Sequence, residues 1–202
     1  MPDARLHRLF ATPLLLAHHP APATINAALL EMVRTLQRGQ AGEDVSNIGG
    51  WHSKGELFAL DNPALRELHA LILSSLGQAL GEMDPALQGV TGQVRVTGWA
   101  NVLPAGAYHT PHHHPGQAWS GCYYLAVPTL PGQGKAGRLE VFDPRNGADM
   151  LPQPGRFFSP SALIDPEPGL LVLFPAWLRH MVHPHPGPDE RVSIAFNLSF
   201  DR

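Results

Sequence analysis

Shortly before its C-terminus the chain reads Arg191-Val192-Ser193-Ile194-Ala195-Phe196-Asn197-Leu198-Ser199-Phe200. Side chains alternate between the two faces of a strand, so one face of this segment is wholly apolar. That face carries Val192, Ile194, Phe196 and Leu198, and the other carries Arg191, Ser193, Ala195 and Asn197. We expect the apolar face to lie beneath helices and the polar face to line a barrel mouth, where ligands can bind. An ordinary surface strand would show the same alternation, so the pattern alone leaves both interpretations open.

Four segments upstream also have the composition of strands. They are rich in Val, Leu, Tyr and Phe, and Pro-Gly, Asn-Gly and Pro-x-Pro sequences separate them, which is typical of turns. These segments are Gln93–Leu103, Gly121–Val127, Arg138–Phe142 and Gly169–Phe174. The 20 glycines and 21 prolines of the chain fit short strands joined by such turns.

The first 90 residues show helical periodicity instead. One amphipathic segment lies between Pro22 and Gly39, which are typical residues at the start and end of a helix. A second helix is indicated by Asn62 as its cap, Pro63 at its first position and an apolar stripe that runs to Met83. Helices followed by antiparallel strands predict an α+β fold. We expect one domain over residues 1–202, with mainly helical support in 1–90 and a β-barrel core in 91–202.

Composition argues against several kinds of partner. The 202-residue chain has a net charge of −3 and no basic run, so neither nucleic acid nor an acidic membrane surface is expected to bind it. It has no apolar run near the roughly 18 residues of a transmembrane helix and no signal-peptide pattern. Cys122 is its only cysteine, which excludes an intramolecular disulfide framework and a multi-cysteine zinc site. We therefore expect a cytoplasmic protein with no membrane partner, and a homodimer is compatible with this fold.

Histidine is the residue type whose excess needs an explanation. Seven of the 12 histidines lie in two clusters, at 109–114 and 180–185. In an extended segment His112 and His114 point to the same side, and His180 follows a predicted strand from which it could face them across a barrel. Histidine is the commonest metal ligand among side chains, so this spacing favours a metal site. A histidine-rich loop without a metal is the alternative, and we expect His109 and His113 to lie behind the ligands or at the surface.

Arg191 and Ser193 add a possible anion site on the polar face of the last strand. A guanidinium group matches the geometry of a carboxylate, and the serine hydroxyl two residues later faces the same way. The order along the chain is therefore a histidine pair, a distant histidine and then Arg-x-Ser.

This order resembles the double-stranded β-helix fold of the Fe(II)/2-oxoglutarate-dependent oxygenases and, more narrowly, a bacterial group of 2-oxoglutarate-Fe(II) oxygenases. The similar stretches cover nearly the whole chain, and their number and order make the combination specific although each is short. They are Ser46–Ser53, Trp99–Val102, His112–Pro115, Ser120–Leu125, Phe142–Arg145, Leu173–His180 and Arg191–Asn197. The resemblance implies a jelly-roll or cupin-like barrel with N-terminal supporting helices.

The resemblance also implies roles for individual residues. His112 and His180 match metal ligands of the family, which binds Fe(II) and uses 2-oxoglutarate as co-substrate. The implied co-substrate-binding residues are Arg191, Ser193, Tyr124 and Asn101. In the family the arginine pairs with the distal carboxylate of 2-oxoglutarate, and a hydroxyl and a tyrosine add hydrogen bonds to that carboxylate.

His114 departs from the wider superfamily, in which a carboxylate stands two residues after the first histidine. We expect His114 to be the third ligand, with Asp143 as the alternative source of a carboxylate if the barrel brings it near. Three imidazoles would also suit zinc. The leading hypothesis is an oxygenase that oxidises, and most simply hydroxylates, a small-molecule or peptide substrate with release of succinate and carbon dioxide. The alternatives are a three-histidine cupin-type metalloenzyme or metal-binding protein that does not use 2-oxoglutarate, and a non-catalytic binding module on the same barrel.

Overall fold

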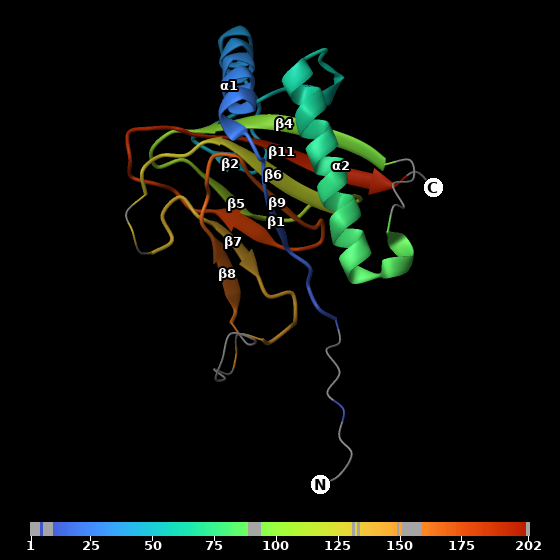
Figure 1. Cartoon of the computed structure of the whole chain (residues 1–202). Helices are drawn as coiled ribbons and strands as arrows, with labels where there is room; N and C mark the ends of the chain where they lie inside the picture. The colour runs from blue at the N-terminus through green and yellow to red at the C-terminus, as the bar shows by residue number, and fades with distance from the viewer. Residues whose placement is uncertain are drawn as a thin grey trace.

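The computed structural model describes residues 5, 10–88, 94–130, 132, 134–148, 150 and 159–200. Its core consists of two antiparallel sheets that face each other, with two helices on the outer side of the larger sheet (Figure 1). The predicted strand start at Gln93 and the expected boundary between residues 90 and 91 fall outside the described residues.

The larger sheet has six strands in the order β1-β9-β6-β11-β4-β3. Their bounds are β1 Leu15–His18, β3 Trp51–His52, β4 Val94–Leu103, β6 Trp119–Ala126, β9 Leu170–Pro175 and β11 Arg191–Phe200. The smaller sheet has five strands in the order β2-β5-β10-β7-β8. Their bounds are β2 Asn47–Ile48, β5 Tyr108–His112, β7 Leu139–Phe142, β8 Ser161–Ile164 and β10 His180–Val182.

Two helices, α1 (Pro22–Gly39) and α2 (Pro63–Met83), cover the outer face of the larger sheet. The Asn62 side chain accepts hydrogen bonds from the first backbone N–H groups of α2, as the sequence predicts. The apolar face of β11 is fully buried in the same core as both helices. This burial confirms that β11 lies beneath the helices. Each large apolar side chain buried there contributes about 1.5–3 kcal/mol to stability. Two short 3-10 turns, Leu57–Ala59 and Pro85–Leu87, flank α2.

The smaller sheet is held at its outer edge by a buried carboxylate. Glu140 on β7 accepts hydrogen bonds from Lys135, from Ser161 on β8 and from His183 just after β10. Although burial raises the pKa of Glu140, these hydrogen bonds together lower it to about 2. The carboxylate therefore stays ionised and ties three neighbouring segments together.

The sequence predicts the long elements better than the short ones. Along the chain, strands β1, β2 and β3 lie before or between the two helices, and the short strands β8 and β10 carry no clear sequence pattern. Trp177 is 53% exposed in the turn after β9. His185 is buried, and its Nε2 atom lies 3.2 Å from the Leu103 carbonyl oxygen.

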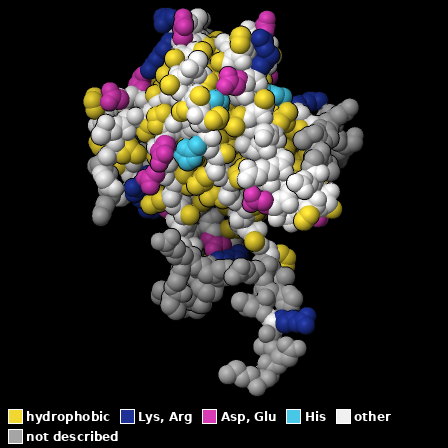
Figure 2. Space-filling model, in the orientation of Figure 1, with side chains coloured by type: hydrophobic (Ala, Val, Ile, Leu, Met, Phe, Trp, Pro, Cys, Tyr) yellow, Lys and Arg dark blue, Asp and Glu magenta, His cyan; other side chains and the backbone are white. Residues whose placement is uncertain are grey.

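The helices in the described part of the chain include none that is long and apolar enough to cross a membrane. On the face drawn in Figure 2, Lys and Arg side chains are scattered among hydrophobic and uncharged ones and form no continuous basic patch.

Candidate metal centre

Three histidines meet between the two sheets at one end of the barrel. His112 ends β5, His114 follows two residues later, and His180 begins β10, directly opposite His112 in the antiparallel ladder. Each offers one ring nitrogen, and the three nitrogen atoms lie within 4.8 Å of one another. The ring centroids of His112 and His180 are 4.3 Å apart, and each lies 5.2 Å from that of His114. The structure thus brings together the three histidines that the sequence predicts.

Backbone carbonyl groups orient two of these rings. The Nδ1 atom of His112 donates to the Thr110 carbonyl oxygen at 2.7 Å, and Nδ1 of His180 donates to the Leu178 carbonyl oxygen at 2.9 Å. Because a carbonyl oxygen can only accept, each Nδ1 carries the proton and leaves a lone pair on Nε2. Such bonds fix the tautomer and ring direction that a metal ligand needs.

Burial also keeps the three rings uncharged. It lowers the pKa of His112, and it lowers that of His114 to about 4 and that of His180 to about 3, with the neighbouring histidines adding to the shift. At neutral pH all three imidazoles are therefore neutral, the form that binds a metal ion. An ion about 2.0–2.1 Å from each nitrogen would hold the nitrogens about 3.0–3.4 Å apart, so small shifts of the side chains close them on one divalent ion.

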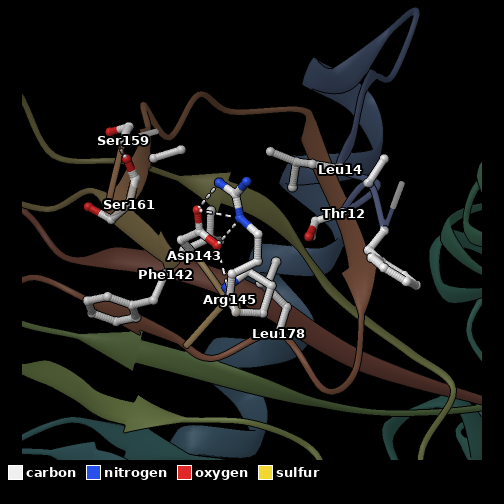
Figure 3. Close-up of a pocket in the computed structure, with 13 residues that line it drawn as sticks. Thr12, Leu14, Phe142, Asp143, Arg145, Ser159, Ser161 and Leu178 are labelled. Atoms are coloured by element: carbon white, nitrogen blue, oxygen red, sulfur yellow. Dashed lines mark hydrogen bonds and ion pairs between the residues drawn. The ribbon is translucent and has the colours of Figure 1, made fainter. Parts of the chain in front are cut away.

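Asp143 does not supply the missing carboxylate. Its side chain accepts hydrogen bonds from the backbone N–H of Arg145 at 2.9 Å and from the Nε atom of the same residue at 3.0 Å. Figure 3 shows this pair lining a hollow of about 380 Å³ beyond the end of β7, which includes none of the three histidines. Among the described residues, the group that could hold a metal contains only His112, His114 and His180.

Three of the other four predicted residues line the same cavity, and the fourth lies next to one of them. Arg191 and Ser193 extend from β11 and Asn101 from β4, and all three line the cavity with the histidines. Ser193 lies opposite Asn101 on one side and Tyr124 of β6 on the other. Tyr124 is not part of the cavity lining, and its ring lies beneath the Arg191 guanidinium group at 4.8 Å.

This part of the cavity is rich in buried polar groups without partners. Arg191 is only 2% exposed, and no ion pair within the described parts of the chain involves it. The Arg191 Nε, the Tyr124 hydroxyl and the Asn101 Oδ1 atoms are buried without a hydrogen-bond partner among those residues. Burial raises the pKa of Tyr124, so its hydroxyl stays protonated and can donate. A buried cation beside the Tyr124 hydroxyl, which is a free donor, fits the carboxylate of a bound anion, because burying an unpaired charge is costly.

Three cavity-lining residues had no definite role in the sequence analysis. His109 is buried and lines the cavity, so its predicted alternative position at the surface is wrong. Trp99 also lines the cavity. Its ring stacks on His52 with a centroid distance of 5.4 Å, and its centroid lies 5.9 Å from that of His114. Cys122 lines the cavity too.

Fold and site together indicate a metal-dependent enzyme of the double-stranded β-helix class, with a buried arginine in the same cavity as three converging histidines. The chain belongs to the family described as "Putative 2OG-Fe(II) oxygenase", whose model matches residues 97–197. It is therefore an oxidoreductase that uses Fe(II) and 2-oxoglutarate, and the three-histidine and anion sites fit both. No curated protein sequence matches the chain.

Solved structures with the same fold share little sequence with this chain. A Pseudomonas putida prolyl-4-hydroxylase has a TM-score of 0.68 at 18% identity, with 96% of each chain covered. A Trichoplax adhaerens prolyl hydroxylase, in complex with a peptide fragment of hypoxia inducible factor, has a TM-score of 0.63 at 16% identity, with 92% of this chain and 83% of that chain covered. HygX from Streptomyces hygroscopicus, with nickel, 2-oxoglutarate and hygromycin B bound, has a TM-score of 0.60 at 13% identity, with coverages of 94% and 83%. These likenesses confirm the predicted fold.

Proposed function

We propose that this oxygenase hydroxylates a small-molecule or peptide substrate. In the balanced reaction, one oxygen atom of O₂ enters a substrate C–H bond and the other enters succinate, while 2-oxoglutarate loses carbon dioxide. Fe(II) and 2-oxoglutarate, when bound, supply the oxidising chemistry, and the protein supplies binding, orientation and exclusion of water.

In this proposal the chain has two sets of binding groups. His112, His114 and His180 hold the metal through neutral ring nitrogens. Arg191 pairs with the distal carboxylate of 2-oxoglutarate, while the Ser193 and Tyr124 hydroxyls donate to it. Asn101, beside Ser193, contacts the co-substrate in the same cavity.

The observation that carries the proposal is the burial of Arg191 without an anionic partner in the cavity that holds the three histidines. An enclosed guanidinium group is costly unless a carboxylate or phosphate meets it. A dianion that reaches from the metal to Arg191 would satisfy both sites at once.

The third histidine strengthens this attraction. A carboxylate ligand would cancel part of the metal charge, whereas three neutral imidazoles leave the full 2+ charge on the ion. At the short distances of a buried site, that difference favours a doubly charged co-substrate. The histidine in place of a carboxylate is therefore compatible with 2-oxoglutarate use.

We place substrate entry at the barrel end that carries the histidines. The loop after β5 meets the turn after β9 there, where the His114 N–H donates to the Ala176 carbonyl oxygen at 2.9 Å. The exposed Trp177 lies in this turn, and the Arg179 guanidinium group lies over the Phe142 ring at 4.8 Å. These groups offer aromatic surface and positive charge to an approaching substrate.

Succinate formation from 2-oxoglutarate by the Fe(II)-loaded protein under air tests the proposal. We expect slow turnover without a second substrate, and we expect Arg191→Ala to abolish it by weakening 2-oxoglutarate binding. The absence of both 2-oxoglutarate binding and succinate in the metal-loaded wild type would overturn the proposal.

The ligand set has a matched pair of variants. His114→Ala should weaken metal binding by at least about tenfold, because even residues behind metal ligands cost that much when removed. His113→Ala, at the exposed position between the two ligands, should bind metal as the wild type does. Equal metal affinities of the two variants would exclude His114 as a ligand.

A further inference from the structure

His109 is a buried histidine to which the proposed function assigns no role. It lies on β5, three residues before the metal ligand His112, and it is 7% exposed. Its side chain lines the cavity that contains the metal ligands and Arg191. The ring centroids of His109 and His112 are 6.1 Å apart, and His109 is not part of the group of described residues that could hold a metal ion.

The Nε2 atom of His109 is buried without a hydrogen-bond partner among the described residues. A buried polar atom without a partner destabilises the protein, so a cavity-lining atom of this kind indicates a missing partner. The charged and titratable groups that act on the His109 ring are Arg191, His112, His52 and His180. None of them is an acid, so among the described residues no carboxylate is close enough to accept a hydrogen bond from Nε2.

His109 lies near both groups that bind the ends of the co-substrate in the proposed function, and it lines the same cavity. It is close enough to His112 at the metal end and to Arg191 at the distal end for both to disfavour its charged form. Asn101, whose Oδ1 atom also lacks a partner, lines the same cavity. An anion held between the metal and Arg191 would pass beside His109.

We propose that His109 is a further 2-oxoglutarate-binding residue, which donates a hydrogen bond from Nε2 to a carboxylate oxygen of the co-substrate. This inference rests on the proposed function, because it requires 2-oxoglutarate to occupy the cavity. The neutral ring is a donor at Nε2 when that nitrogen carries the proton. Burial keeps the ring neutral, so it adds no charge beside Arg191 and the metal.

Two variants separate this role from simple packing. His109→Leu fills the position but removes the donor, whereas His109→Gln places an amide N–H near the original Nε2 atom. A residue with a packing role alone would not distinguish between them in 2-oxoglutarate binding. His185→Leu is the matched control, because His185 is equally buried, has an unpartnered Nδ1 atom and lies outside the cavity lining.

The experiment is a calorimetric titration of 2-oxoglutarate into the Zn(II)-loaded full-length protein, which cannot turn over. We expect His109→Leu to raise the dissociation constant roughly tenfold to hundredfold, the value of one hydrogen bond to a charged group. His109→Gln and His185→Leu should bind as the wild type does. The affinity for Zn(II), measured separately, should be the same in all variants.

A measurement on the wild type protects the test against a variant that fails to fold. In protein labelled with ¹⁵N at histidine, addition of 2-oxoglutarate should shift the Nε2 resonance of His109 and leave that of His113 unchanged. This inference alone would be overturned if the wild type bound 2-oxoglutarate tightly and His109→Leu bound it equally well. It would also be overturned if 2-oxoglutarate bound to the wild type without shifting the His109 resonance. No 2-oxoglutarate binding by the wild type would overturn the proposed function and this inference together.

Discussion

Replacing Arg191 with methionine should weaken 2-oxoglutarate binding without destabilising the ligand-free protein. Methionine has a similar length and no charge, so the change removes the buried guanidinium group and keeps most of the packing. The cation is 2% exposed, and no ion pair among the described residues compensates its charge.

The magnitude follows from two opposing contributions. Removing a charge from a buried site recovers several kcal/mol of desolvation free energy. The guanidinium group lies over the Tyr124 ring at 4.8 Å, and this cation–π contact contributes up to about 2 kcal/mol in the opposite sense. Without 2-oxoglutarate we therefore expect the variant to be as stable as the wild type, or more stable by up to about 2 kcal/mol. Its 2-oxoglutarate affinity should fall by about 2–5 kcal/mol, because the ligand carboxylate loses its buried partner.

Urea unfolding of the Zn(II)-loaded proteins, with and without 2-oxoglutarate, measures both effects in one assay. The wild type should gain about 2.7 kcal/mol at a ligand concentration one hundred times its dissociation constant, and the variant should gain far less at the same concentration. The control Arg66→Met removes an exposed arginine paired with Asp61 and should change stability by no more than about 0.5 kcal/mol. A loss of more than about 2 kcal/mol in ligand-free Arg191→Met would refute the reasoning, because it would mean that the buried cation is already compensated within the protein.

Three further results should be measurable. Gly121→Ala should destabilise the fold by about 3 kcal/mol or more, because its Cβ would lie 2.2 Å from the Val172 carbonyl oxygen. Gly77→Ala in α2 has open space for its Cβ and should stabilise the fold by up to about 1 kcal/mol. Equal changes of the unfolding free energy in urea would disprove the close approach at β6. The metal-free protein should lose stability as the pH falls from 6.5 towards 4. Over this interval the histidines of the unfolded chain bind protons, whereas His114 and His180 in the folded protein stay neutral because burial lowers their pKa values. A rise in stability over this interval would contradict the burial of neutral imidazoles. Trp177→Ala should slow oxidation of the substrate while 2-oxoglutarate binding stays unchanged, as a substrate assay and a 2-oxoglutarate titration would show. An unchanged rate of substrate oxidation would place Trp177 outside the substrate surface.

The sequence predicts much of this molecule because its main elements carry local signals. The cap at Asn62 and the alternation along β11 each depend on neighbouring residues, and both predictions are confirmed. The convergence of His112, His114 and His180 could be predicted only through the resemblance, since residues 112 and 180 meet through strand pairing that no local pattern encodes.

What could not be predicted depends on long-range contacts. The buried Nε2 atom of His109 finds no hydrogen-bond partner among the described residues, and no local sequence pattern indicates this. Strands β8 and β10 have four and three residues, too few to show a periodicity. The exposure of Trp177 and the burial of His185 likewise depend on which loops pack together, because both residues lie between regular elements.

The shortness of β10 links the metal to the topology of the smaller sheet. This three-residue strand separates β5 from β7, and its first residue faces His112 across the ladder. A slip of one residue would turn His180 to the outer face, so only the native pairing can form the three-nitrogen site. A bound ion would therefore stabilise this strand pairing over others during folding. Amide hydrogen exchange in β10 would then slow on metal loading more than exchange in β11, which lies in the other sheet.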